Sequence, residues 1–247
     1  MQMKLIMKTF FNYFFLLLVL SVLSCKEEEQ EKPKVTYRAT AAAEVKRDTT
    51  QIKIADLPIQ MEGTNYLLHP IGDVRVYNGG GSKFSYGSSS TNRVSYAISN
   101  FSRYEITGFL NNIYIQHIDS TNTKPLTKEP VIIQSATYLY SMAEKTKKQI
   151  LVYTLSDLDT NKDGKLDTND INSLYISEIS GNSFMKLSPD YQELIDWNLI
   201  ESKNRLYFRT KEDTNKNGDF DKDDAVSYYF VDLMDKEWKL NEYTPFD

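Results

Sequence analysis

The chain has 247 residues, enough for one domain or for one domain and a small appendage. Its net charge of −5 argues against nucleic acid as a partner, because binding phosphates needs a basic face. Hydrophobic residues make up 40% of the chain, which is ample for a core, and its 17 Tyr favour strands.

Residues 1–24 have the organisation of an export signal. Lys4 and Lys8 supply a positive start, and residues 10–20 form an apolar stretch too short for a transmembrane helix. The signal ends in Val-Leu-Ser-Cys, closing at Cys25, which resembles the lipobox of bacterial lipoproteins with Val where Leu is usual. The resemblance implies acylation of Cys25, cleavage before it and anchoring in the outer membrane, at the cell surface or facing the periplasm. The alternative is a plain secretory signal with a coincidental cysteine.

Residues 25–50 are predicted to be a disordered, charged tether. Cys25 is the only cysteine, so the mature chain forms no internal disulfide. The Lys-, Glu- and Pro-rich run behind it cannot pack a core. A Lys followed by acids at this place resembles the signal that sends some Gram-negative lipoproteins to the outer face. An ordinary hydrophilic tether explains the run equally well.

Residues 51–247 are predicted to form a β-rich repeat domain. Short runs of alternating or β-branched residues suggest strands, and long helical periodicity is scarce. The candidate strands before and between the repeats are 50–54, 73–77, 93–98 and 149–154.

Three segments align with one another, and each has the pattern of strand, tight turn and short strand. They are residues 112–127, 173–188 and 227–241, ending in Leu126-Thr, Leu187-Ser and Leu240-Asn. With the hairpin predicted at 197–209, they resemble blades of the TolB-type β-propeller repeat over residues 85–245. The resemblance implies an all-β fold of propeller-like antiparallel sheets, either incomplete or four-bladed. A closed propeller needs at least four blades, and three can be assigned.

Two twelve-residue stretches, 159–170 and 213–224, have the pattern of EF-hand-like calcium loops. Each has an oxygen-bearing side chain at positions 1, 3 and 5, Gly at 6, Asp at 9 and a carboxylate at 12. Ca²⁺ needs six to eight such oxygens, and Gly permits the sharp turn at position 6. The first loop's predicted ligands are Asp159, Asn161, Asp163, the carbonyl of Lys165 and Asp170. The second loop's are Asp213, Asn215, Asn217, the carbonyl of Asp219 and Asp224.

Asp at position 12 reaches less far than Glu and is typical of dockerins and extracellular calcium loops, for which affinities of about 10⁻⁵ to 10⁻³ M are expected. Helices flanking the loops would indicate a calcium sensor or a dockerin. Residues 225–231 are largely β-branched and aromatic, however, so we expect strands around the loops.

No catalytic motif is present, so the sequence predicts no enzyme. The expected function is a lipid-anchored, calcium-braced scaffold that binds an unknown protein or glycan. A dockerin-like module and, behind it, a hydrolase acting on surface polymers are the alternatives.

Overall fold

A computed structural model describes residues 33–37, 53–73, 75–77, 93–95 and 97–246. The predicted signal peptide, the lipidation site Cys25 and most of the predicted tether lie outside these residues. No helix in this described part of the chain is long and apolar enough to cross a membrane.

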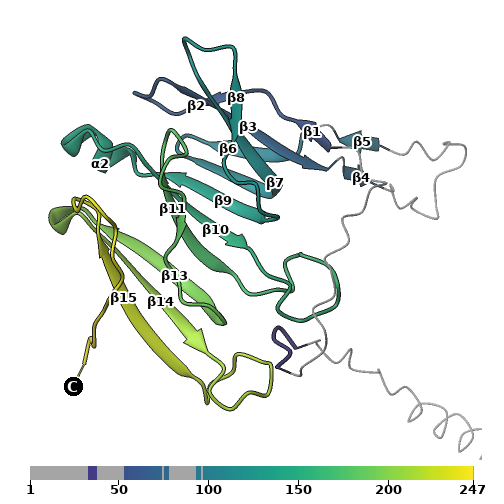
Figure 1. Ribbon diagram of the computed structural model, residues 1–247, viewed down its shortest axis with the longest axis vertical. Coiled ribbons are helices and arrows are strands. Elements are labelled where there is room, and N and C mark those ends of the chain that lie inside the picture. The colour runs from purple at the N-terminus through teal and green to yellow at the C-terminus, as the bar shows by residue number, and fades with distance from the viewer. Residues whose placement is uncertain (1–32, 38–52, 74, 78–92, 96, 247) are drawn as a thin grey trace, which may run out of the picture. The chain divides into compact units, whose positions relative to one another are not determined.

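The strands form two larger antiparallel sheets and a small one (Figure 1). The first sheet comprises β1 (Lys53–Ala55), β2 (Ile59–Gln60), β3 (Tyr66–Asp73), β6 (Ser99–Ser102), β7 (Glu105–His117), β8 (Thr123–Pro125), β9 (Ile132–Tyr138), β10 (Ile150–Ser156), β11 (Ser173–Glu178) and β12 (Met185–Lys186). The second comprises β13 (Gln192–Ile200), β14 (Arg205–Glu212), β15 (Ala225–Asp232) and β16 (Asn241–Glu242). The third is β4 (Arg75–Tyr77) paired with β5 (Arg93–Ser95). The helical elements in the described residues are α2 (Tyr140–Thr146) and the 3₁₀ turn η1 (Glu201–Lys203).

Strand β7 joins two parts of the first sheet. Its first half pairs with β6 and β9, and its second half pairs with β3 and β8. The register shifts between Thr107 and Leu110, next to Gly108, where a Cβ would lie 2.8 Å from the carbonyl oxygen of Ile98. Gly108 therefore allows this close approach of two backbones.

Strand β10 is buried on both faces and links the two hydrophobic cores. Leu151, Tyr153 and Leu155 lie in the core shared with β7 and β9. Ile150 and Val152 lie in the second core, where they pack with residues of β14 and β15 such as Leu206 and Val231. Each fully buried Leu or Val contributes about 1.5–3 kcal/mol. The first core therefore holds the parts of the first sheet together, and the second core joins the first sheet to the second.

Each of the three aligned segments forms the predicted hairpin. Tyr114 of β7, Tyr175 of β11 and Tyr229 of β15 occupy the same place and pair with Pro125, Lys186 and Glu242. The hairpin over β13 and β14 is also present, and its turn is closed by Asn204 in the left-handed conformation.

The alignment of the third segment was wrong at its end. Leu126 and Leu187 donate their N–H to the strand residues Ile113 and Leu174. In the third segment the equivalent bond runs from the N–H of Tyr243 to the carbonyl of Tyr228 in β15. Leu240, which the alignment placed there, is 41% exposed. The longer turn of the third copy shifts the register by three residues, which the sequence pattern alone could not indicate.

The predicted all-β class is confirmed, since antiparallel strands dominate and α2 is the one α-helix of the described residues. The finer prediction of a propeller is not resolved, because the described sheets close into no ring. Within residues 53–73, β1 pairs with β3, and β3 pairs with β7 of the first repeat. These residues therefore extend the sheet of the first repeat and do not form a separate blade.

Gly181 in the β11–β12 turn packs against the first part of the sheet. Its φ is +74°, and an added Cβ would lie 2.5 Å from Cδ1 of the buried Ile115. Gly63 has the same φ of +74° but open space around it. We therefore expect Gly63→Ala to lower the free energy of unfolding by about 1–2 kcal/mol. Gly181→Ala should cost a further 1–3 kcal/mol or so. Urea unfolding of both variants measures the difference, and equal losses would contradict the packing role of Gly181.

Candidate calcium loops

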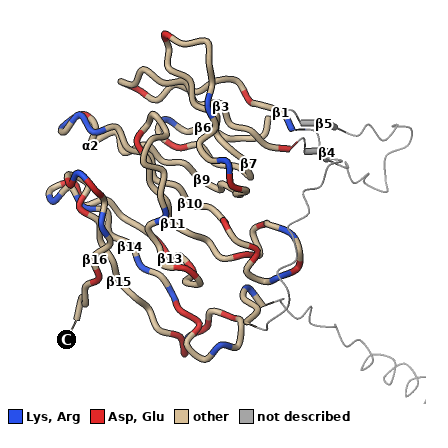
Figure 2. Tube along the Cα trace, viewed as in Figure 1, with Lys and Arg blue, Asp and Glu red and all other residues tan. Residues whose placement is uncertain are grey.

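Both predicted loops connect equivalent strands of their sheets. Residues 159–170 lie between β10 and β11, and residues 213–224 lie between β14 and β15 (Figure 1). Acidic residues gather on both loops, with basic residues between them (Figure 2). The strands on either side rule out flanking helices of the sensor or dockerin type at both loops.

The first loop folds around its own side-chain oxygens. Asp159 at position 1 accepts the N–H of Asp163 at 3.1 Å and of Gly164 at 2.9 Å. Asn161 accepts the N–H of Asp163 at 2.9 Å, and Asp163 accepts that of Lys165 at 2.9 Å. The loop turns at Lys162 and Gly164, which have φ of 59° and 83°. Side-chain oxygens at positions 1, 3 and 5 are therefore held on the inner side of one turn.

The second loop repeats this arrangement position for position. Asp213 accepts the N–H of Asn217 at 3.1 Å and of Gly218 at 2.7 Å. Asn215 accepts the N–H of Asn217, and Asn217 accepts that of Asp219, both at 2.8 Å. The left-handed residues are again those at positions 4 and 6, Lys216 and Gly218. The match extends from sequence to backbone conformation.

The carboxylate at position 12 closes each loop from inside. Asp170 is fully buried and accepts the N–H of Thr160 at 2.8 Å and of Asp167 at 3.0 Å. Asp224 is 7% exposed and accepts the equivalent N–H groups of Thr214 and Asp221 at 3.0 and 2.9 Å. Both closing carboxylates are thus oriented by the loop backbone and shielded from water.

A threonine at position 2 also fastens each loop, which the sequence analysis missed. The hydroxyl of Thr160 accepts the N–H of Ile171, and the hydroxyl of Thr214 accepts the N–H of Ala225, both at 3.1 Å. These bonds join the start of each loop to the first residue after it. The signal was present in the sequence, because Asp-Thr-Asn opens both loops.

The donor set of the first loop suits a hard divalent cation. Burial raises the pKa of the Asp170 carboxyl, its backbone hydrogen bonds lower it, and the charge of Asp159 raises it again. A bound cation would offset both the desolvation and the repulsion between these carboxylates. Asp159, Asn161, Asp163 and Asp170 would hold it, with the carbonyl of Lys165. The second loop, with Asn at positions 3 and 5, has two carboxylates among its predicted side-chain ligands, where the first loop has three.

Within the described residues, no group of three or more His, Cys, Asp and Glu side chains gathers as a metal cluster. The second loop has two carboxylates among its predicted ligands and depends on Asn side chains besides. The three carboxylates predicted for the first loop, Asp159, Asp163 and Asp170, do not gather as such a group. Asp167 and Asp221 at position 9 accept the N–H of Asn169 and Asp223, at 2.8 and 2.9 Å.

Residues 33–37, which fall within the predicted tether, lie between the two loops; we call them the N-terminal strap (Figure 1). Val35 donates its N–H to the carbonyl of Gly218 at 3.1 Å, and Thr36 donates to the carbonyl of Thr160 at 2.9 Å. Burial, and after it the charge of Asp213 and the hydrogen bond to that carboxylate, raises the pKa of the Tyr37 hydroxyl to about 12. The predicted tether therefore includes a docked segment.

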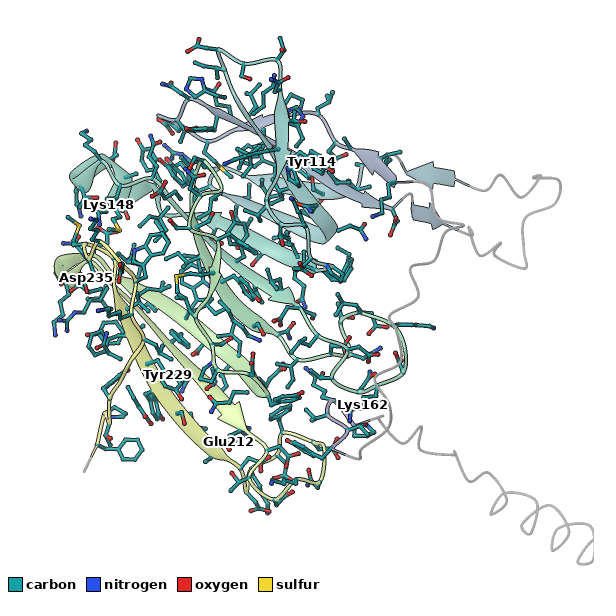
Figure 3. The ribbon with its side chains drawn as sticks, viewed as in Figure 1. Tyr114, Lys148, Lys162, Glu212, Tyr229 and Asp235 are labelled. Atoms are coloured by element: carbon teal, nitrogen blue, oxygen red, sulfur yellow. The ribbon has the colours of Figure 1, made fainter. Side chains whose placement is uncertain are left out.

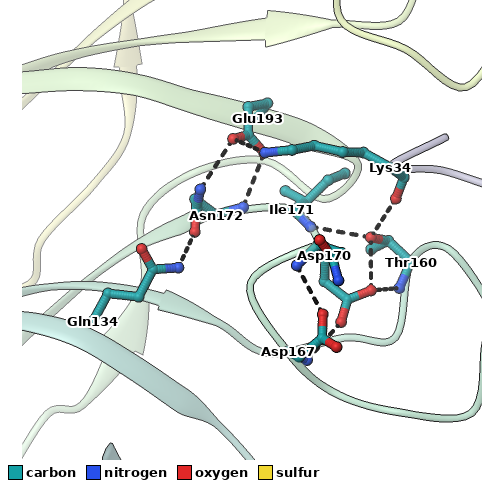
Figure 4. A network of polar contacts seen from close by, with 9 residues as sticks. Lys34, Gln134, Thr160, Asp167, Asp170, Ile171, Asn172 and Glu193 are labelled. Carbon is teal, nitrogen blue, oxygen red and sulfur yellow. Dashed lines mark hydrogen bonds and ion pairs between the residues drawn. The ribbon is translucent and has the colours of Figure 1, made fainter. Parts of the chain in front are cut away.

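A polar network ties the strap and the first loop to the second sheet (Figure 4). Lys34 forms an ion pair with Glu193 of β13 at 2.7 Å. Glu193 also accepts the side-chain and backbone N–H groups of Asn172, each at 3.0 Å, directly after the first loop. The exit of the loop is thus fixed to the neighbouring sheet.

A cleft of about 830 Å³ lies at the ends of the strands away from the loops. It is lined by turns of both larger sheets and includes Tyr66, Glu178 and Trp238. Lys148 and Asp235 lie at this end (Figure 3). The ammonium of Lys148 donates to three backbone carbonyls, those of Leu233, Met234 and Asp235. It therefore stabilises the turn that follows β15.

No known family model matches the chain, and a search of curated proteins finds no match either. The resemblances to bacterial lipoproteins, to EF-hand and dockerin loops and to TolB-type repeats therefore stay predictions.

Proposed function

We propose that this protein is a lipid-anchored, extracytoplasmic calcium-binding protein, whose β-repeat domain is a binding or scaffold module stabilised by two structural Ca²⁺ ions. In this proposal the anchor is the acylated Cys25, and the repeats are propeller-like blades. The partner is a protein or a glycan outside the cytoplasm. The ions brace the module and take part in no reaction.

The observation that carries the proposal is that the two loops have the same backbone conformation and the same internal hydrogen bonds. Loops 54 positions apart in the sequence share their left-handed residues and the same hydrogen bonds to positions 1, 3, 5 and 12. Carboxylates close together in one loop repel one another unless a cation is shared between them, as the charge of Asp159 on Asp170 illustrates. Because the same arrangement occurs twice, a bound cation is a better explanation for it than a coincidence of turn geometry.

A structural role is favoured over a sensor role. Each loop joins two long strands, and a rigid sheet offers no helix pair that could open on binding. With expected affinities of about 10⁻⁵ to 10⁻³ M, the sites would be between about half and almost fully occupied at millimolar external calcium. No contact in the described residues favours the dockerin or hydrolase alternative.

Calorimetric titration of the full-length chain in detergent micelles tests the proposal. We expect two Ca²⁺ ions to bind, and Asp159→Ala and Asp213→Ala each to remove one, because each variant deletes the position-1 ligand of one loop. Asp119→Ala is the matched control, since its carboxylate is 84% exposed and outside both loops. A chain that binds no calcium, or loop variants that bind like the control, would contradict the proposal.

A further inference from the structure

The N-terminal strap contacts both loops through their backbones. Besides the two N–H bonds described above, the hydroxyl of Thr36 donates to the carbonyl of Asn161 at 2.9 Å. In the opposite direction, the hydroxyl of Thr160 donates to the carbonyl of Lys34 at 2.8 Å. Val35 between them is 2% exposed. The strap is thus an extended segment held by positions 2 and 3 of the first loop and position 6 of the second.

These contacts depend on the calcium-loop conformation. Asn161 precedes Lys162, the left-handed residue at position 4, so the direction of its carbonyl is set by that turn. Gly218 itself has φ of 95° and donates its N–H to Asp213, the position-1 ligand. An added Cβ on Gly218 would lie 2.6 Å from the carbonyl oxygen of Val35, so the strap also requires glycine here. Gly164, the equivalent residue of the first loop, has open space around it.

We infer that calcium binding and docking of the N-terminal strap are coupled, so that filled loops hold the strap and empty loops release it. The inference rests on the proposed function, since it requires the loops to bind calcium. A cation that fixes the ligands at positions 1, 3 and 5 also fixes the carbonyls that bind the strap. By linkage the docked strap strengthens calcium binding by the same factor.

The coupling would set how far the β-repeat domain can lie from the proposed acylated Cys25. Pro33 is the eighth residue after Cys25, and eight residues span at most about 30 Å. The next described element, β1, begins at Lys53, and the 28 residues to it span at most about 100 Å. Release of the strap would therefore raise the longest possible connection between Cys25 and the β-repeat domain.

Amide hydrogen exchange of the full-length chain in detergent micelles tests the inference. We expect the amides of Val35 and Thr36 to exchange about tenfold or more faster in chelator than in millimolar calcium. Trypsin should cut after Lys34 faster in chelator as well. Calcium binding is measured on the same sample by calorimetry. If calcium binds and the two amides exchange equally with and without it, the coupling is wrong and the proposed function stands. If no calcium binds, both fail.

Two strap variants test the reciprocal effect. Val35→Asp places a carboxylate in a buried position between two acidic loops, and we expect it to weaken calcium binding about tenfold. Lys34→Gln is the matched control, because it removes the ion pair with Glu193 and keeps the backbone bonds to the loops. Equal calcium affinities for Val35→Asp and wild type would overturn the coupling. The exchange experiment on the wild-type chain decides the question if Val35→Asp fails to fold.

Discussion

Removing calcium from the full-length chain is expected to lower its melting temperature by about 10 to 20 °C. Each ion at a hundred times its dissociation constant adds about 2.7 kcal/mol to the free energy of unfolding, because it binds the folded loops and not the unfolded chain. For a domain of this size each kcal/mol shifts the melting temperature by about 2–4 °C. Circular dichroism melts in calcium and in EDTA measure the shift, and added calcium should restore it.

The effect should reach the whole domain, since the loops are tied to both sheets. Asp157, two residues before the first loop, accepts hydrogen bonds from Ser173 and Tyr175 of β11 and forms an ion pair with Lys186 of β12 at 2.9 Å. The loop exit is bonded to Glu193 of the second sheet. The double variant Asp159→Ala, Asp213→Ala is the control, and its melt should not respond to EDTA. A wild-type melt that EDTA leaves unchanged would refute the structural role of calcium.

The hairpins and the loops were predictable because they are local. A strand that alternates, a turn rich in Gly and Asn, and a loop with oxygens at fixed positions all lie within a few residues of one another. Position 12 could be assigned for the same reason, and its burial follows from the bonds that Asp170 and Asp224 accept within their own loops.

The features that escaped prediction depend on contacts far apart in the sequence. Strand β7 pairs with four partners, and nothing in its own residues specifies which half meets which strand. Helix α2 has seven residues, too few for stability alone, and it forms because Met142 and Ala143 are buried in the cores. The strap looks like tether by composition, and the groups that bind it are far away in the sequence, among them the carbonyls of residues 160, 161 and 218.

Two tyrosines at matching sequence positions before the loops should differ sharply in their contribution to stability. They do not match in register, because Tyr153 pairs with Tyr175, whereas Tyr207 pairs with Phe230 and Phe208 pairs with Tyr229. Tyr153 and Tyr207 each lie six residues before position 1 of a loop. Tyr153 is fully buried between layers, with its hydroxyl 2.8 Å from that of Ser177 and its ring edge-on to Phe184. Tyr207 is half-buried on the face of the second sheet opposite Leu206 and Phe208, beside Tyr243.

We expect Tyr153→Ala to lower the free energy of unfolding by about 3–5 kcal/mol, because it removes a large core side chain and leaves a cavity. Tyr207→Ala should cost about 1 kcal/mol, since water can reach the vacated space. Tyr153→Phe isolates the hydroxyl and should cost about 1 kcal/mol for its lost hydrogen bond. Urea unfolding with saturating calcium measures all three. Equal losses for the two alanine variants would mean that the outer face of β14 is covered as fully as the inner core, as it would be if another layer closed over it.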